Sequence, residues 1–456
     1  MHVISTDRTT ALSLTTASDE VFILPGVKFA AFSDWAAIYG DAISLEITNF
    51  GNVFGFNYGM QFYVSASGGN IANSAGAIIA GGSTGLSLES AFTYISNGGT
   101  ISGGSGAAVE MFGNWQSLHN LAGGTLRGGL DGVLATGECE IFNDGTISAR
   151  GVGVRINGFS EISNAGSIFG SGEYGVVIQG SWSSLTNSGY IGGSHVGVYV
   201  VADTGETRIY NSGTIEGIYI ESSSTSPTFI FNSGELHGVY NMYSGPVVLR
   251  NSGDIIGDVV GGYDTQDTIR NIGTIAGEVR LQGGNDIFNG AGGTVTGSVD
   301  GGAGNDRLTA GDHDVVRGGL GNDLLRGAGT MDTLIGGRNA DRMFGGGGAD
   351  TFLFESHLES GATNGTADRI LLFDRNQDII DLELVDADSV AAGNQEFTFI
   401  GTASFSNVAG QLRAVNAGAN VFLQADLDGN GTTDFQVILG GLSGQAAQFT
   451  AEDFVL

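Results

Sequence analysis

The sequence predicts an all-β protein, in which a right-handed parallel β-helix continues into a β-roll and ends in a β-rich cap. A repeat of 18 to 24 residues with three aliphatic positions runs through most of the chain, and glycine–aspartate nonapeptides follow it. Helical periodicity is absent, and β-branched residues dominate the repeat. The expected divisions are an N-terminal cap with the first coils (1–45), the β-helix (46–299), the β-roll (300–354) and the C-terminal cap (355–456).

Composition narrows the class of protein. The 456 residues include 80 glycines, 3 prolines and 41% hydrophobic residues, which excludes collagen and plain disorder. The 48 acidic residues against 17 basic ones give a net charge of −31, which repels nucleic acid and anionic membranes. No apolar run reaches the length of a membrane span. A hard cation is the expected partner for so much carboxylate.

Cysteine use and the N-terminus give two further expectations. Cys139 is the single cysteine, so the chain forms no internal disulfide. The opening residues MHVISTDRTTALSL lack a basic stretch followed by a long apolar one, which is not typical of a Sec signal peptide. Taken alone, this predicts a cytosolic protein, although an export signal at the C-terminus would change that expectation.

The long repeat is built around Asn-x-Gly. An aliphatic residue stands two positions before each asparagine, a second one stands shortly after it, and a third lies near mid-repeat, as at Val133, Val154 and Val176. The series of asparagines is Asn49, Asn73, Asn97, Asn120, Asn143, Asn164, Asn187, Asn211, Asn232, Asn251, Asn271 and Asn289. The inward residues expected before them run from Ile47 to Ile287, and those after them include Val53, Ile78 and Ile101.

Three inward positions per repeat predict three short strands per coil. Each coil of a parallel β-helix pairs its backbone with the next coil, glycines allow positive φ at the corners, and stacked asparagines form an amide ladder. Residues 1–45 fit the repeat poorly and are expected to cap the open end.

From residue 300 the pattern tightens to nine residues, as in GGAGNDRLT and GGLGNDLLR. An apolar residue follows two positions after each aspartate, for example Leu308 after Asp306. Two nonapeptides make one coil, so alternate aspartates are expected on opposite edges. The aspartates are Asp306, Asp314, Asp323, Asp332, Asp341 and Asp350, with degenerate forerunners at Asp267 and Asp286.

Aligned carboxylates at one-coil spacing repel one another unless a cation lies between them. Carboxylate and carbonyl oxygens at high coordination number are the ligands that Ca²⁺ prefers. Residues 282–353 resemble the RTX family, whose G-G-x-G-x-D-x-U-x repeats bind calcium. Asp312, Thr330 and Asn339 replace the third glycine in weaker copies. The expected ligands are Gly301, Gly302, Gly304, Asp306, Asp314, Gly318, Gly319, Gly321, Asp323, Asp332, Gly336, Asp341, Gly345, Gly346, Gly348 and Asp350.

The last hundred residues resemble the C-terminal domain of serralysin-type secreted proteins. Gly393–Gly401 match a G-x-Q-x-F-x-F-x-G segment, Asp426–Ile438 match an Asp-Gly turn feeding a strand, and Asp453–Leu456 match the acidic-then-apolar end. The resemblance implies export by a bacterial type I secretion system that reads the uncleaved C-terminus. The resemblance does not extend to the zinc protease of that family, because no two of the six histidines stand in H-E-x-x-H spacing.

Two further acidic groups are candidate calcium ligands. Asp426, Asp428, Asn430 and Asp434 resemble the first nine positions of an EF-hand loop, but Val437 stands where the last glutamate belongs, so a solvated turn is the alternative. Asp368, Asp378 and Asp381 either close the calcium roll or lie on a solvated strand edge.

The expected function is a secreted calcium-binding β-solenoid that folds on calcium outside the cell and acts as a surface, matrix or adhesive scaffold, with a polysaccharide or cell-surface ligand as a further candidate partner. The alternative is a polysaccharide lyase or epimerase with a cleft near residues 130–210. No polar residues share a common repeat offset there, and a broken threonine series argues against an ice-binding face. The candidates are Asp131, Asp144, Arg155, His195, Asp203 and Arg208.

Overall fold

The computed structural model describes residues 1–41, 43–63, 68–180, 182–201, 205–223, 225–311, 314–329 and 331–456. The chain divides into two compact units, Met1–Gly245 and Pro246–Leu456. Nearly all regular structure is β-strand, with two short 3₁₀ turns, η1 (Ala446–Gln448) and η2 (Ala451–Asp453). Within the described ranges, no helix has the length and apolarity needed to cross a membrane.

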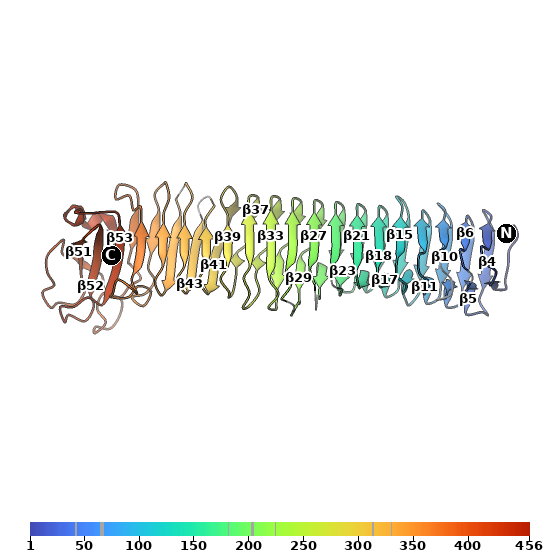
Figure 1. Ribbon diagram of the computed structural model, residues 1–456, viewed down its shortest axis with the longest axis horizontal. Helices are drawn as coiled ribbons and strands as arrows, with labels where there is room; N and C mark the ends of the chain where they lie inside the picture. Colours follow the sequence, from blue (N-terminus) through green and yellow to red (C-terminus); the bar gives the residue numbers. More distant parts are fainter. Residues whose placement is uncertain are drawn as a thin grey trace. The chain divides into compact units, whose positions relative to one another are not determined.

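The N-terminal unit is a parallel β-solenoid with three strands per coil, which confirms the predicted fold class (Figure 1). Its strands form three stacks, named A, B and C. Stack A holds β1 (His2–Ile4), β3 (Glu20–Ile23), β6 (Glu46–Asn49), β9 (Asn70–Asn73), β12 (Tyr94–Asn97), β15 (Gln116–Asn120), β18 (Cys139–Asn143), β21 (Ser160–Asn164), β24 (Ser183–Asn187), β27 (Thr207–Asn211) and β30 (Thr228–Asn232). Stack B holds β4 (Lys28–Ala31), β7 (Asn52–Gly55), β10 (Ile78–Gly81), β13 (Thr100–Gly103), β16 (Thr125–Gly128), β19 (Thr146–Ala149), β22 (Ser167–Gly170), β25 (Tyr190–Gly193), β28 (Thr214–Ile215) and β31 (Glu235–Leu236). Stack C holds β2 (Leu12–Leu14), β5 (Ala36–Gly40), β8 (Tyr58–Phe62), β11 (Thr84–Leu88), β14 (Val109–Met111), β17 (Asp131–Thr136), β20 (Val152–Asn157), β23 (Tyr174–Ile178), β26 (Val196–Val200), β29 (Ile218–Ile220) and β32 (Val239–Asn241).

The core of this unit consists of the aliphatic positions that the repeat predicts. Strand residues alternate between inside and outside, so every inward residue stacks on its counterpart one coil away. Ile141, Ile147 and Val154 represent the three stacks, and each is fully buried. One expectation was wrong by a residue, because Ile79 rather than Ile78 pairs with Val53 and is fully buried. The backbone register between coils determines which of the two adjacent isoleucines is buried, and composition alone does not specify that register.

A ladder of asparagine side chains runs along one edge of stack A. Nδ2 of each asparagine donates to Oδ1 of the next at 2.7–2.9 Å, from Asn49 through to Asn232. The same amide nitrogens also reach backbone carbonyls, as Asn143 does to Gly145 and Ser167. Buried amides remain satisfied in this way, which is the predicted structural role of the series.

The C-terminal unit begins with three strands per coil and changes to two after β40. Its stack A holds β33 (Val247–Asn251), β36 (Thr268–Asn271), β39 (Ile287–Asn289), β42 (Arg307–Thr309), β44 (Leu324–Arg326), β46 (Arg342–Phe344) and β48 (Asp368–Leu371). Stack B holds only β34 (Asp254–Ile255), β37 (Thr274–Ile275) and β40 (Thr294–Val295). Stack C holds β35 (Val259–Val260), β38 (Val279–Arg280), β41 (Ser298–Ala303), β43 (Val315–Leu320), β45 (Thr333–Arg338), β47 (Thr351–Leu353), β49 (Ile379–Asp381) and β54 (Phe454–Val455).

The asparagine ladder of this unit joins Asn251 to Asn271 at 2.8 Å, and Asn289 departs from it. Asn289 is exposed and pairs in register with Arg270, while Phe288 pairs with Ile269 and is buried. The prediction of Ile287 as an inward residue was therefore wrong. In this coil the register follows Asp286, which is buried and stands two residues before Phe288, as in the nonapeptides.

An antiparallel meander closes the chain. It consists of β51 (Gln411–Ala417), β52 (Asn420–Asp426) and β53 (Phe435–Gly440), and the short β50 (Thr398–Phe399) pairs with β51. Strand β53 continues stack A by pairing parallel with β48, and β54 pairs with β49. The last coil of the roll is thus covered on both stacks, which protects its backbone edge.

Candidate calcium centre

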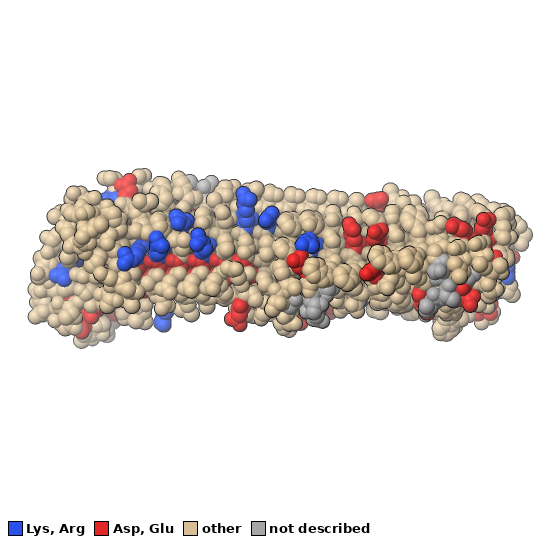
Figure 2. All heavy atoms as spheres, viewed as in Figure 1, with Lys and Arg blue, Asp and Glu red and all other residues tan. Residues whose placement is uncertain are grey.

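Buried aspartates form two rows in the C-terminal unit, each aspartate at or immediately before the start of a strand. Every one is at least nine-tenths buried. Row 1 precedes stack A and consists of Asp267, Asp286, Asp306, Asp323, Asp341 and Asp368. Row 2 precedes stack C and consists of Asp314, Asp332, Asp350 and Asp378. The two-edge arrangement predicted from nine-residue spacing is present, and on the face seen in Figure 2 acidic atoms run in a line beside basic side chains across these strands.

The backbone N–H of an aspartate in one coil holds the carboxylate of the corresponding aspartate in the next coil. In row 1 the backbone N–H of Asp306 donates to Oδ1 of Asp323, and that of Asp323 to Oδ1 of Asp341, at 2.8 and 2.7 Å. Row 2 repeats this between Asp332 and Asp350 at 3.0 Å. One oxygen of each side chain is therefore part of the stacking of the coils. The same bond joins Asp267 to Asp286, Asp286 to Asp306, Asp341 to Asp368, Asp314 to Asp332 and Asp350 to Asp378.

The second oxygen of six of these aspartates is buried without a hydrogen-bond partner in the described part of the chain. Each such oxygen is an acceptor that has lost its water, which costs free energy unless a donor or a cation is present. Five belong to row 1 and one to row 2. They are Oδ2 of Asp286, Asp306, Asp323, Asp341, Asp368 and Asp350.

Burial raises the pKa of these carboxyl groups far above the usual range. Desolvation is the main cause, and the neighbouring aspartate in the row adds to it. The pKa is raised to about 8 for Asp286 and Asp341, to about 7 for Asp323, and to about 6 for Asp306 and Asp350. The pKa of Asp368 is also raised well above its usual value. The rows therefore bind protons readily when no cation neutralises them.

The first glycine of each nonapeptide makes room for the carboxylate. A Cβ added to Gly301, Gly318 or Gly345 would lie 2.4 Å from Oδ2 of the aspartate five residues later, and one added to Gly336 would lie 2.6 Å away. No side chain fits there while the carboxylate keeps its place. The motif therefore encodes a cradle around the oxygen that has no partner.

The second and third glycines have positive φ against the neighbouring coil. This holds for Gly302, Gly319 and Gly346 as well as for Gly304, Gly321 and Gly348. A Cβ on Gly304 would lie 1.4 Å from the carbonyl oxygen of Gly284. Asn339, which replaces the third glycine, keeps the positive φ of 88°. The other two replacements, Asp312 and Thr330, lie outside the described residues.

The oxygen atoms of the two rows are suitable ligands for a hard divalent cation. Six of these aspartates offer a buried carboxylate oxygen with no hydrogen-bond partner among the described residues, beside glycine-rich turns whose backbone has no side chain to block an ion. Oxygen ligands in flexible geometry suit Ca²⁺, whereas Mg²⁺ requires a strict octahedron and retains its waters. Asp368 and Asp378 extend the two rows by one coil each.

Four residues lie differently from the predicted arrangement of acidic groups. Asp381 joins neither row, because it lies within β49 and its Oδ1 accepts from the backbone N–H of Glu383. Asp267 and Asp286 belong to row 1, although they stand in degenerate copies of the motif. Glu359 was missed; it is buried, and its charge contributes to raising the pKa of Asp341. No repeat marks its position in the sequence.

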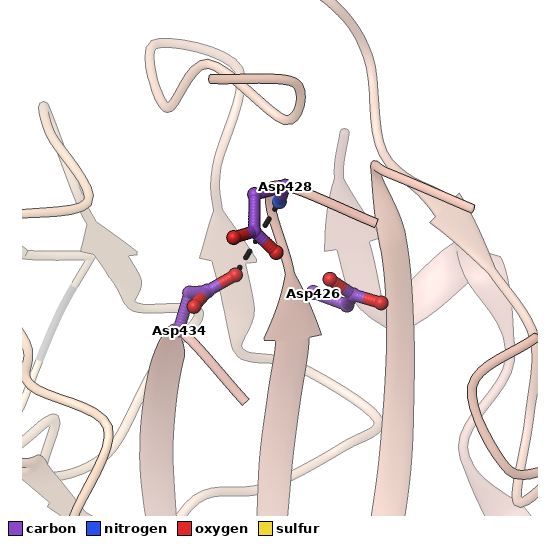
Figure 3. Close-up of side chains that lie close together, drawn as sticks. All are labelled: Asp426, Asp428 and Asp434. Carbon is purple, nitrogen blue, oxygen red and sulfur yellow. Dashed lines mark hydrogen bonds between the residues drawn. The ribbon is translucent and has the colours of Figure 1, made fainter. Parts of the chain in front are cut away.

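A separate acidic cluster lies at the turn between β52 and β53. One carboxylate oxygen each from Asp426, Asp428 and Asp434 lies within 4.8 Å of the others (Figure 3). Oδ2 of Asp434 accepts from the backbone of Leu427 at 2.8 Å, and both oxygens of Asp426 accept from Gly429 and Gly431. Asn430 donates to Asp428 instead of pointing at the cluster's other members. The turn brings the EF-hand-like aspartates together.

The candidates for an enzyme site on the N-terminal unit do not converge. Asp131 pairs with Arg155 at 3.4 Å in stack C, and Arg208 pairs with Glu206 on stack A. His195 lies near the rings of Tyr174 and Tyr219. Asp144 is exposed, and Asp203 lies outside the described residues.

Comparison with known proteins places the C-terminal part of the chain. No curated protein matches the sequence. Among solved structures, the AlgE6R2 subunit of the Azotobacter vinelandii mannuronan C5-epimerase is 28% identical over 33% of this chain and 88% of its own, with a TM-score of 0.25. The AlgE6R3 subunit of that epimerase is 25% identical over 42% and 80%, with a TM-score of 0.22. Residues 282–456 match the family model described as Peptidase M10 serralysin C terminal. The C-terminal part of the chain is therefore a serralysin-type C-terminal domain with RTX-type repeats.

Proposed function

We propose that this protein is a secreted calcium-binding β-solenoid whose C-terminal unit folds on calcium outside the cell and which acts as a surface, matrix or adhesive scaffold. One observation carries the proposal: six buried carboxylate oxygens have no partner among the described residues, and five of them stack at one-coil intervals in row 1. A calcium-free roll at neutral pH would have to bury these charges unpaired or take up protons, and both cost free energy. A divalent cation between them removes that cost.

Calcium binding and folding are coupled in this proposal. The ligands come from different coils, so no site exists in the unfolded chain and the free energy of binding contributes to folding. Extracellular calcium modules bind at roughly 10⁻⁴–10⁻³ M, whereas a calcium-poor cytosol leaves the roll unfolded. The turn holding Asp426, Asp428 and Asp434 is proposed as a further calcium site.

The proposal includes export by a type I secretion system that recognises the C-terminus. Its support is the serralysin-type domain at residues 282–456, a kind of domain typical of secreted bacterial proteins. An unfolded, calcium-free roll suits passage through a narrow export channel.

Circular dichroism of the full chain tests coupled folding. In calcium-free buffer at pH 8 we expect reduced strand signal, and titration with CaCl₂ should restore it with a midpoint in the submillimolar to millimolar range. MgCl₂ at the same concentration is the matched control and should restore little. Strand content that is the same with and without calcium would disprove coupled folding.

The second candidate function is a polysaccharide-active enzyme, a lyase or epimerase. The observation in its favour is a groove of about 540 Å³ lined by residues between 115 and 184, which overlaps the region near residues 130–210 expected for a cleft. Incubation with alginate and pectin tests it. Unsaturated products or altered uronate composition would replace the scaffold proposal with the enzymatic one.

A further inference from the structure

Exposed aromatic side chains line one corner of the N-terminal unit, just before stack A. Extending the strand registers by one or two residues aligns Phe92, Trp115, Glu138, Phe159 and Trp182 on five successive coils. The four aromatic residues are 53–62% exposed. Clustered large apolar side chains on a surface indicate a binding function, whereas isolated ones do not.

The backbone at this corner makes a purely structural explanation insufficient. Phe92, Trp115 and Trp182 have φ of 58°, 60° and 59°, a left-handed conformation that glycine adopts without strain and that bulky residues rarely adopt. Glycine fills the equivalent position one coil earlier, at Gly68 with φ of 71°. The aromatic residues are therefore less favourable for the fold than glycine, which points to a role for their exposed rings.

A groove lies between these rings. It measures about 540 Å³ and is lined by Trp115, Phe159 and Trp182 together with polar side chains at its base. Gln116, which is 1% exposed, lines it, and its Oε1 has no hydrogen-bond partner within the described ranges. Oε2 of Glu138 is likewise buried without one. Both atoms are acceptors only, so a ligand that satisfies them must supply donors.

The charge of the groove narrows the class of ligand that can supply these hydrogen-bond donors. Glu140 and Glu161 pair in register on β18 and β21 and also line the groove, so adjacent carboxylates face the ligand. They repel a polyanion and accept hydrogen bonds from hydroxyl groups. We propose that this groove binds an uncharged polysaccharide, whose sugar hydroxyls donate to the acceptors while the C–H faces of its rings stack on the tryptophans.

The repeat distance of the corner supports a chain-like ligand. Successive coils lie about 4.8 Å apart, because strands of neighbouring coils are hydrogen-bonded. This spacing is close to the length of one pyranose ring in an extended chain, so successive sugars would meet equivalent positions on successive coils. The groove lies wholly within the N-terminal unit and contains no part of the aspartate rows. The inference therefore does not rest on calcium-driven folding, and it competes with the second candidate function, which would place a uronate polymer in the same groove.

Binding of soluble oligosaccharides to the full, calcium-saturated chain tests the proposal. Cellohexaose, xylohexaose and mannohexaose serve as neutral probes and an oligogalacturonate as the anionic one, with isothermal titration calorimetry and tryptophan fluorescence as readouts. We expect at least one neutral probe to bind and the oligogalacturonate not to bind. Trp115→Gly and Trp182→Gly should weaken that binding about tenfold or more.

The glycine variants separate binding from folding. Because glycine adopts positive φ freely, both variants should keep or raise the unfolding temperature while they lose affinity. Trp35→Ala, which removes a 62% exposed tryptophan on another coil, is the matched control and should bind as the native chain does. The proposal would be overturned if none of the three neutral probes binds or if the oligogalacturonate binds more tightly than they do. It would also be overturned if the Trp115 and Trp182 variants change in sedimentation behaviour without losing sugar binding.

Discussion

The backbone N–H of Asp306 donates to Oδ1 of Asp323 across one coil at 2.8 Å, and Oδ2 of that same carboxylate has no partner among the described residues. One side chain thus does two things: it joins adjacent coils and it presents a buried ligand oxygen. Stacking the coils consequently also stacks the ligands. The fold and the proposed metal site share the same carboxylate, which is consistent with the recurrence of aspartate at this position in every nonapeptide of the chain.

Asp323→Asn separates these two roles. The amide oxygen can still accept from Asp306, but the buried negative charge and one ligand oxygen are lost. Without calcium at pH 8 the variant should unfold at a higher temperature than the native chain, by about 2–4 °C for each kcal/mol regained. With calcium it should unfold at a lower temperature and bind about tenfold more weakly, because affinity follows the number of ligand charges. Scanning calorimetry with and without calcium measures the two shifts in unfolding temperature, which should have opposite signs.

Asp264→Asn is the control for that experiment, since Asp264 is exposed in the same unit and loses the same charge. It should shift neither curve by more than a degree or so, as expected for a surface substitution. If Asp323→Asn destabilises the calcium-free chain as well, the carboxylate is not repulsive in the apo roll and the argument from buried charge is wrong.

The pH dependence without calcium should be the reverse of ordinary acid denaturation. The row carboxyls have folded pKa values of about 6 to about 8, above the unfolded value of 3.8. Their protonated forms stabilise the fold, so this contribution is present below about pH 4 and is lost as pH rises through 6 to 8. The calcium-free C-terminal unit should be more stable at pH 5 than at pH 8.

Calcium should invert that trend, because it binds the deprotonated carboxylates and competes with protons. Thermal unfolding followed by circular dichroism at pH 5 and pH 8, with and without calcium, gives the four values needed. Stabilisation by calcium should be larger at pH 8. A calcium-free chain that is more stable at pH 8 than at pH 5 would contradict the raised pKa values.

Two glycines of one GGGG run should respond very differently to alanine. A Cβ on Gly345 would lie 2.4 Å from Oδ2 of Asp350, whereas a Cβ on Gly347 would have no atom within 4 Å. Gly345→Ala should cost about 1–3 kcal/mol of stability and reduce the calcium response, since the carboxylate must move. Gly347→Ala should be neutral or stabilise by a few tenths to about 1 kcal/mol through the unfolded state. Calcium-dependent unfolding of both variants checks this, and equal effects would contradict the cradle.

Much of this architecture could be predicted from the sequence because the repeat restates it many times. Each copy offers the same inward aliphatic positions, so a chance match at one coil is corrected by the next. The aspartate rows follow from nine-residue spacing for the same reason. Where copies degenerate, the prediction loses a residue of register, as with Ile78 in place of Ile79 and Ile287 in place of Phe288.

Features that occur once could not be predicted in this way. Glu359 follows no repeat, and its proximity to Asp341 depends on the path of the segment between β47 and β48. The bond from each backbone N–H to the next carboxylate depends on atomic positions across coils, which spacing alone does not specify. The aromatic corner was missed although the sequence carries a signal for it: Phe92, Trp115, Phe159 and Trp182 each stand five residues before a ladder asparagine, and Glu138 holds the same offset in the coil between them.

The last two members of the asparagine series give the sharpest test of register. Asn271 is fully buried, accepts from Asn251 at 2.8 Å and donates to the carbonyl of Thr294 at 3.1 Å, whereas Asn289 is exposed and bonds only locally to Ala291. Asn271→Ala removes both of these hydrogen bonds, which should cost about 1–3 kcal/mol at about 0.5–1.5 kcal/mol for each bond. Asn289→Ala should change stability by less than about 0.5 kcal/mol. Chemical denaturation in saturating calcium measures both, and similar losses would mean that Asn289 belongs to the ladder after all.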